Sequence, residues 1–285
     1  MDQPHATTGV SHLTEQDRQA FLRDGYVLRR GFFDAEEVGL LGQAIEQDPA
    51  IRHNVAQIND SRGATTELAL WNHPGDDLFG MVARCARIVD GMELLLGGEV
   101  YHYHTKLTMK RPKVGGAWDW HQDYGYWYNN GCLFPDMASV FIAIDPSRRE
   151  NGCLEVLRGS HLMGRIEHGR VGGQTGADVE RVEQAMKVLE HVHCEMDPGD
   201  ALFFHCNTLH SSSQNTSDRS RNVMLSCYNR VTNNPYKLHH HPQVTKLHKV
   251  GDERIKAVGL TTAGSARDFY RVADDATVAA AAPRS

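Results

Sequence analysis

Residues 118–128 read WDWHQDYGYWY and residues 198–212 read PGDALFFHCNTLHSS, and these two stretches decide the fold and its chemistry. The first places His121 and Asp123 two positions apart, so that in an extended segment both side chains point to the same side. The second passes from a turn through the apolar strand ALFFH and reaches His210. We therefore expect distant strands of a barrel-like fold to bring His210 to His121 and Asp123.

Two histidines and one carboxylate are the ligand set typical of non-haem iron(II) oxygenases, because they leave three positions of an octahedron open. We predict that His121, Asp123 and His210 bind Fe(2+). Structural zinc would close its shell with four ligands, usually including cysteine. A zinc site built on His205, Cys206 and His210 is the alternative, but the sequence has no C-x-x-C pair to support it.

Arg221 follows His210 by eleven residues and shares strand parity with Val223 and Leu225, so we expect it to face inward. A buried guanidinium needs an anion, and its planar fork suits a carboxylate. The distal carboxylate of 2-oxoglutarate fits that role. Arg219 has the same parity but lies closer to a polar loop, so it is the second candidate for binding this carboxylate.

The sequence pattern around these motifs predicts a jelly roll, which is a mainly β fold, with helices that flank it. Between residues 100 and 228 turn residues separate short β-rich runs, namely VYHYHTKLTM, ASVFIAI, CLEVL, HVHCEM, ALFFH and NVMLSCY. We expect one domain over 1–285, with a helical part (14–98), a jelly-roll core (about 99–230) and a C-terminal extension (231–285). Helices are predicted after Thr14, after Asp34, over 78–96 and after Asp178. The glycine-rich GGQTG at 172–176 suggests a mobile loop. We expect the loop and helix over 164–189 to form a lid that closes over the pocket.

Composition excludes several classes of protein. With 285 residues, 40% hydrophobic content and a net charge of −6, the chain can bury a core and lacks the basic balance of nucleic-acid binders. Its six cysteines are widely spaced, which predicts reduced, buried thiols. No apolar run approaches the roughly 20 residues of a membrane span. We expect a cytoplasmic protein whose partners are a small molecule and O2, not nucleic acid or a membrane.

Most of the 17 histidines need another explanation than metal binding. The run at 239–241 precedes a proline and predicts a solvated loop. His102 and His104 alternate on one strand, which predicts a polar face, with the approach of one of them to the pocket as the alternative.

The sequence resembles the phytanoyl-CoA dioxygenase family in its order of motifs. These are DGYVLRRGFF, KLTMKRPKVGGAWDWHQD, ENGCLEVLRGSH and PGDALFFHCNTLHSSSQN followed by an arginine. The resemblance implies a double-stranded β-helix (cupin-like jelly roll) and iron ligation by His121, Asp123 and His210. It also implies that 2-oxoglutarate contacts Arg221, Ser212, Lys106 and Phe141. Arg158 departs from the family, which usually has proline before Gly-Ser-His.

We therefore predict an Fe(II)- and 2-oxoglutarate-dependent dioxygenase that hydroxylates a small organic molecule, for example a specialised metabolite, and releases succinate and CO2. The alternatives are a non-catalytic jelly-roll sensor, or a desaturase or epimerase on the same scaffold. A halogenase would need a small residue in place of Asp123. We assign Trp127, Tyr124 and His161 to the substrate pocket. If the segment stays extended, Trp127 points with His121, whereas Tyr124, Tyr126 and Tyr128 point away. The aromatic run favours a ring-bearing or polar substrate over a long acyl-CoA.

Overall fold

The computed structural model describes residues 12–171, 173–261 and 267–271. The predicted helix, strand and second helix open the chain as α1 (Glu15–Asp24), β1 (Tyr26–Arg29) and α2 (Ala35–Gln47), and α3 (Pro49–His53) follows them. Thr14 and Asp17 form a capping box at the start of α1. Gly25 ends this helix with φ of 83°, a left-handed conformation that favours glycine.

The single helix predicted over 78–96 is wrong, because the chain forms two helices there. They are α4 (Leu78–Arg84) and α5 (Ala86–Leu96), separated by Cys85 in an extended conformation. Cys85 forms an isolated bridge with Val250, whose backbone N–H donates to the carbonyl of Arg84. This tertiary pairing from the C-terminal part of the chain interrupts the helix, which local periodicity could not reveal.

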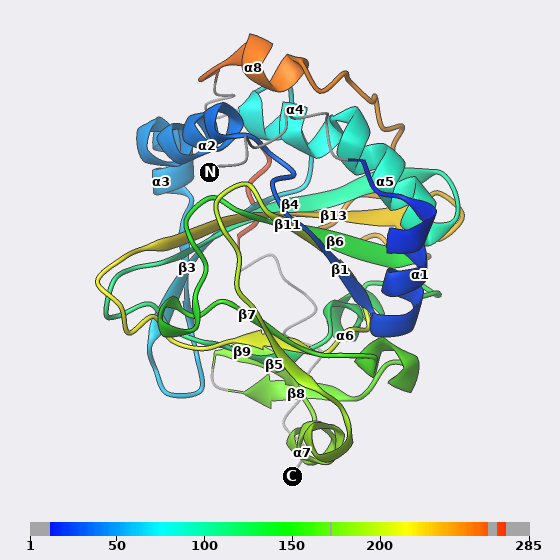
Figure 1. Cartoon of the computed structure of the whole chain (residues 1–285). Helices are drawn as coiled ribbons and strands as arrows, with labels where there is room; N and C mark the ends of the chain where they lie inside the picture. The colour runs from blue at the N-terminus through cyan, green and yellow to red at the C-terminus, as the bar shows by residue number, and fades with distance from the viewer. Residues whose placement is uncertain (1–11, 172, 262–266, 272–285) are drawn as a thin grey trace, which may run out of the picture.

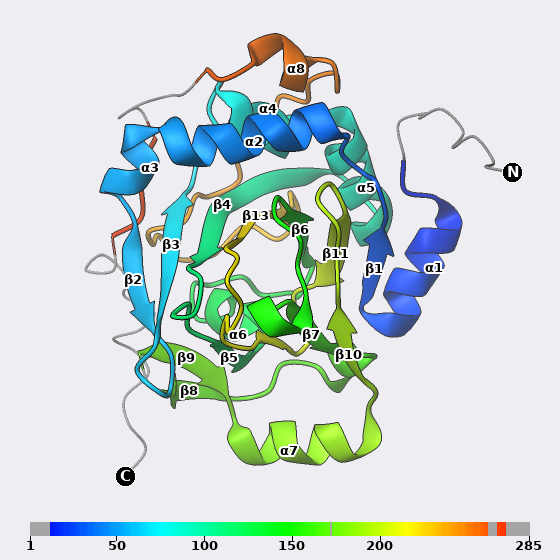
Figure 2. The ribbon, with the colours of Figure 1, turned by 60° about the vertical axis from the view of Figure 1, so that its left-hand side comes forward.

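Two antiparallel sheets form the body of the molecule (Figures 1 and 2). The major sheet has the order β1, β11 (Ala201–His205), β6 (Met137–Ala143), β13 (Arg221–Arg230), β4 (Val100–Lys110), β3 (Thr65–Trp71) and β2 (Ala56–Asn59). The minor sheet has the order β10 (His191–Cys194), β7 (Leu154–Leu157), β12 (His210–Ser212) and β5 (Trp118–His121). All six predicted β runs are strands, so the jelly-roll prediction is confirmed.

The residues of β6 show why this architecture holds together. Val140 and Ile142 lie in the core beneath the helices, whereas Phe141 and Ala143 lie in a second core between the sheets. A central strand buried on both faces has a continuous apolar sequence, and β6 is MASVFIA. Helices α2, α4 and α5 cover the outer face of the major sheet (Figure 2), which leaves the inner face for the space between the sheets.

The insert before β10 contains a two-stranded sheet, β8 (His168–Val171) and β9 (Gln174–Ala177), and then α7 (Val179–Val188), which Asp178 caps as predicted. Much of the predicted glycine-rich loop is therefore a strand. The buried residues of α7 are Val182 and Ala185, whereas Val179 and Met186 are exposed. Two short helices, α6 (Asp123–Trp127) and α8 (Arg254–Val258), and two 3-10 turns at 149–151 and 160–163 complete the elements.

Within these described ranges, no helix has the length and apolar character needed to cross a membrane. All six cysteines are buried free thiols, as predicted. The end of the predicted C-terminal extension, from residue 272 onward, lies outside the described residues.

Candidate active site

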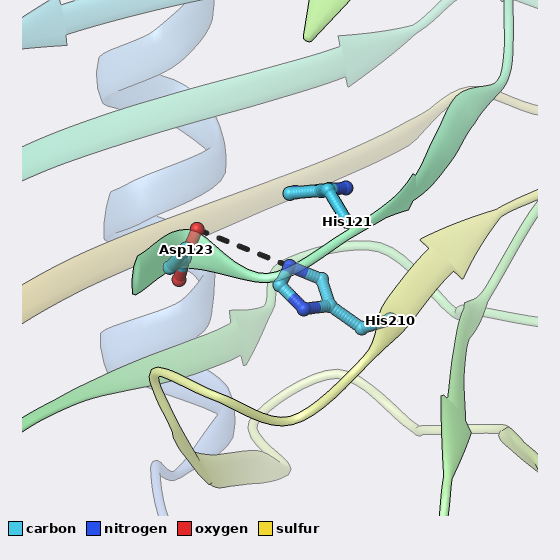
Figure 3. A group of neighbouring side chains, drawn as sticks. All are labelled: His121, Asp123 and His210. Carbon is cyan, nitrogen blue, oxygen red and sulfur yellow. Dashed lines mark ion pairs between the residues drawn. The ribbon is translucent and has the colours of Figure 1, made fainter. Parts of the chain in front are cut away.

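His121, Asp123 and His210 converge between the two sheets, as Figure 3 shows. His121 ends β5 and His210 begins β12, and the two are register partners in the minor sheet. The ligand atoms of the three side chains all lie within 4.8 Å of one another, and all three residues are buried. His210 Nε2 lies 4.0 Å from Asp123 Oδ1. The structure thus assembles the predicted ligand set from two strands and the start of a helix.

The expectation that the His121–Asp123 segment stays extended is wrong beyond Gln122. Gln122 is extended, but Asp123 is the first residue of α6, and the Tyr124 N–H donates to the Cys206 carbonyl. The buried amide of Gln122 fixes this change of direction. It donates to the carbonyls of Gly164 and Asn207, both at 2.8 Å, and accepts from the Ile166 N–H.

Backbone carbonyls orient both imidazoles. His121 Nδ1 lies 2.7 Å from the Asp119 carbonyl oxygen, and His210 Nδ1 lies 2.9 Å from that of Thr208. Because a carbonyl can only accept, each Nδ1 carries the proton and donates it. Each Nε2 therefore presents a lone pair toward Asp123, the tautomer that metal binding requires.

The charges of the centre suit a divalent cation. Burial lowers the pKa of His121 and of His210, which keeps both rings neutral. Burial alone would raise the pKa of Asp123, but nearby positive charge, chiefly the Lys106 ammonium, outweighs burial and holds this pKa below its usual range. Lys106 Nζ lies 3.7 Å from Asp123 Oδ1, and the Ser139 hydroxyl donates to Oδ2 at 3.0 Å. Two neutral imidazoles and one carboxylate match the donor set for iron(II).

Arg221 lies in the same cavity and is 1% exposed. Its Nε and one terminal nitrogen have no hydrogen-bond partner among the described residues, and its guanidinium lies 5.7 Å from the centre of the Phe141 ring. Burial lowers the pKa of Arg221 to about 10, so it is still charged at neutral pH. Buried unpaired donors on a cation fit the carboxylate of a bound 2-oxo acid. Arg219 is exposed instead.

The cavity itself measures about 170 Å³ and joins the metal ligands to Arg221. Four further predicted residues line it, namely Ser212, Lys106, Phe141 and Trp127. Tyr124 and His161 do not. The Tyr124 ring packs in a core cluster and its hydroxyl donates to the Cys132 carbonyl, while His161 Nε2 lies 3.0 Å from the carbonyl oxygen of Leu22. Tyr126, expected to point away, lines the cavity because α6 replaces the extended segment.

Sequence reasoning missed Lys110, which is fully buried. Its ammonium donates to the Ser212 hydroxyl at 2.8 Å and carbonyl at 3.2 Å, and also to the Ser213 carbonyl. Burial, together with the charge of Arg221, lowers the pKa of Lys110 well below its usual value. No local sequence signal pointed to it, because its pairing with Arg221 exists only in the register of the folded sheet.

Histidines from two parts of the chain also line the cavity. His104 on β4 and His241 stack with their rings 4.7 Å apart, and Trp127 contacts His104. Both ring nitrogens of His104 are buried and lack a hydrogen-bond partner in the described structure. Burial lowers the pKa of His104 and of His241 well below the usual value. The solvated-loop interpretation is therefore wrong for His241, whereas the approach of His104 to the pocket, left as an alternative, is correct.

No residue of the predicted lid lines the cavity in the part of 164–189 that the structure describes. Helix α7 packs instead with Leu157 of β7 and with Leu209, which directly precedes β12, and Figure 1 shows the helix beneath the minor sheet. The segment supports the site from behind, because the Tyr126 hydroxyl donates to the Thr175 carbonyl of β9 at 2.6 Å.

Comparisons with known proteins show which family this chain resembles. Residues 21–223 match the family model described as phytanoyl-CoA dioxygenase (PhyH). The L-proline trans-4-hydroxylase of Streptomyces griseoviridis is 33% identical over 230 residues, which cover 75% of this chain and 85% of that protein. The ectoine dioxygenase of Stutzerimonas stutzeri is 26% identical over 236 residues, covering 75% and 76%.

Solved structures show the same fold. The structure of EctD from S. alaskensis with bound Fe superposes with a TM-score of 0.69 at 23% identity, covering 87% of this chain and 92% of that one. The EctD structure with 2-oxoglutarate and 5-hydroxyectoine gives a TM-score of 0.66 at 24% identity, covering 82% of each chain.

Proposed function

The chain belongs to the phytanoyl-CoA dioxygenase family, and we propose that this Fe(II)- and 2-oxoglutarate-dependent dioxygenase hydroxylates a compact, carboxylate-bearing molecule, with a cyclic amino acid as the preferred class. The net reaction inserts one oxygen atom of O2 into a substrate C–H bond. The other atom enters succinate as 2-oxoglutarate loses CO2. The observation that carries the substrate proposal is the small cavity, which has metal ligands and unpartnered His104 nitrogens on its wall.

His121, Asp123 and His210 would hold the iron through Nε2, a carboxylate oxygen and Nε2. Iron(II), when bound there, supplies the chemistry that activates dioxygen. The carbonyls of Asp119 and Thr208 fix both imidazole tautomers, so the ligands need little reorganisation. Lys106 attracts Asp123 Oδ1 and the Ser139 hydroxyl donates to Oδ2, so both oxygens of the carboxylate are held in place.

Arg221 and Ser212 would bind the distal carboxylate of 2-oxoglutarate. Because an ammonium has no lone pair, the Ser212 hydroxyl must accept from Lys110 and can turn its own hydrogen toward an anion. Phe141 closes one side of the guanidinium and excludes water from it. These residues give the distal carboxylate one cation and one hydroxyl donor in a dry site.

The substrate wall consists of Trp127, His104 and His241. Trp127 offers an apolar ring surface, and the His104 ring offers one N–H donor and one acceptor in a place without water contact. Binding of a carboxylate beside these imidazoles would supply the missing partner. Such a wall suits a compact polar substrate better than a long acyl chain.

The proposal is supported by the 33% identical proline hydroxylase and by the ectoine dioxygenases. The test is an aerobic assay with Fe(II), ascorbate and 2-oxoglutarate in which L-proline, L-pipecolate, ectoine and phytanoyl-CoA are compared. We expect a product heavier by one oxygen atom, with equimolar succinate, from a compact amino acid or its derivative. Efficient turnover of phytanoyl-CoA, with none of the compact compounds hydroxylated, would contradict the substrate class.

We also propose a cytoplasmic location. The six unpaired thiols support it, because a reducing compartment keeps cysteines free. Detection of the tagged protein in the culture medium or in a periplasmic extract, and not in the cytosolic fraction, would contradict it.

A further inference from the structure

A second group of metal-binding side chains lies on the outer face of the minor sheet. On β7, Leu154 lines the cavity, whereas Leu157 packs with the residues of α7 on the opposite side. Glu155 shares the parity of Leu157 and therefore faces outward. Strand β10 pairs with β7 so that His193 is the register partner of Glu155 and His191 that of Leu157. Both imidazoles therefore stand on the same outer face as the Glu155 carboxylate.

The three side chains are close enough to share one ion. Their ligand atoms all lie within 4.8 Å of one another. Glu155 Oε2 lies 2.8 Å from His191 Nε2 and 3.9 Å from His193 Nδ1. Two ligand atoms of a tetrahedral zinc ion, each about 2.0–2.1 Å from it, lie roughly 3.3 Å apart. Small rotations of the side chains would give that spacing.

A simple ion pair between Glu155 and His191 is the alternative, and it explains only part of the geometry. His193 Nδ1 is buried and has no hydrogen-bond partner in the described structure. Buried imidazole nitrogens normally have a partner. A shared cation would supply one to His193 and leave the carboxylate of Glu155 bound to the same ion.

We propose that Glu155, His191 and His193 form an accessory zinc site, distinct from the iron centre. Two histidines and one glutamate are a known zinc ligand set, which leaves a fourth position for water. The site can fill from solvent, because the side chains of His191 and His193 are 34% and 25% exposed. Glu155, at 8%, forms its buried floor.

Zinc at this position would stabilise the strand that carries the co-substrate residues. The other oxygen of Glu155 accepts from the Ser213 N–H at 3.2 Å and from the Ser213 hydroxyl at 2.5 Å. The Ser213 carbonyl in turn accepts from Lys110, which also donates to Ser212. The accessory site is therefore linked to the 2-oxoglutarate pocket through one residue.

Metal stoichiometry tests the proposal. Tag-free protein is dialysed against zinc, and native mass spectrometry counts the zinc ions bound per chain. Absorbance of the cobalt(II)-loaded protein gives a second measure of the same sites. We expect two equivalents for the wild type and one for His191→Ala/His193→Ala, for Glu155→Gln and for His121→Ala/His210→Ala. Glu155→Gln keeps a hydrogen-bond acceptor of the same shape, so it tests the carboxylate even if the double histidine variant fails to fold. The control His73→Gln/His248→Gln removes two exposed histidines elsewhere and should still bind two.

Thermal unfolding gives an independent readout. In the His121→Ala/His210→Ala background, zinc at 100 times its Kd should raise Tm by about 5–10 °C. Glu155→Gln in that background should abolish the rise. Equal zinc counts for wild type and Glu155→Gln, or no zinc in the His121→Ala/His210→Ala variant, would overturn the accessory site. Neither result would affect the proposed hydroxylase function.

Discussion

Arg221 and Lys110 are cross-strand register partners at the ends of β13 and β4, and both are buried. Like charges placed opposite each other destabilise a sheet. The strands nevertheless hold Arg221 in the wall of the cavity and Lys110 against Ser212 and Ser213, and burial lowers the pKa of each. A carboxylate bound to the unpartnered nitrogens of Arg221 would offset part of this repulsion.

Arg221→Ala should raise the 2-oxoglutarate KM about 30-fold or more. Removing one partner of a buried charged hydrogen-bonded pair costs roughly 2–5 kcal/mol. Iron binding should persist, because Arg221 is not one of the clustered metal ligands. The matched control is Arg219→Ala, at an exposed position on the same approach to β13, which should behave like the wild type. The reverse pattern in steady-state kinetics would show that the arginine is misassigned.

Replacing His121, Asp123 or His210 by alanine should abolish turnover and the weak visible charge-transfer band expected when 2-oxoglutarate chelates iron(II) under anaerobic conditions. The reason is that each side chain would contribute one of the three protein ligands proposed for the iron. Anaerobic titration followed by absorbance makes the measurement. Full activity of the zinc-loaded, iron-free wild type would refute the oxygenase assignment.

Trp127→Ala should reduce hydroxylation of the substrate, while slow decarboxylation of 2-oxoglutarate continues uncoupled from hydroxylation. The Trp127 ring lines the cavity and contacts His104, so its loss leaves substrate poorly placed without touching the metal ligands. The ratio of succinate to hydroxylated product measures this uncoupling. Tyr124→Phe is the control, because the Tyr124 hydroxyl only donates to the Cys132 carbonyl outside the cavity. An unchanged ratio in Trp127→Ala would place substrate elsewhere.

His104→Phe should raise the substrate KM by about tenfold or more and leave the 2-oxoglutarate KM unchanged. The variant keeps a buried ring but loses both nitrogens, and a hydrogen bond to a charged group contributes about 1.5–3 kcal/mol. Initial rates at varied concentrations of each substrate separate the two effects. A rise in both constants would indicate a general packing defect instead.

Acid should destabilise the fold partly through His205. Burial lowers the pKa of His205 from 6.5 to about 4. In the unfolded chain the His205 imidazole is protonated below pH 6.5, whereas in the folded chain it stays neutral until about pH 4. The free energy of unfolding therefore falls as the pH drops from 6.5 to about 4. At pH 5 the contribution is about 2 kcal/mol. Urea unfolding measures the free energy of unfolding at pH 7 and pH 5. The difference between these two values should be smaller for His205→Asn than for the wild type, and asparagine keeps an acceptor for the Asn207 N–H.

The sequence by itself determined the β strands of the core and the identity of the residues that cluster at the metal centre. Strands such as β6 and β11 were predictable because burial on both faces demands continuous apolar runs. Helices α1 and α2 were predictable because their caps are local, from Thr14 and Asp34. The inward direction of Arg221 followed from the two-residue period of a strand.

Only the tertiary structure decided how the chain leaves β5 and what surrounds the cavity. Hydrogen bonds from Gln122 to residues more than forty positions away redirect the chain, so that a helix begins at Asp123. The direction predicted for Tyr126 from strand parity was therefore wrong. His241 reaches His104 across the fold, and Lys110 meets Arg221 only through sheet register. Such contacts join segments far apart in sequence. Periodicity reports which face of its own element a residue occupies, whereas the partner on that face depends on how the elements pack.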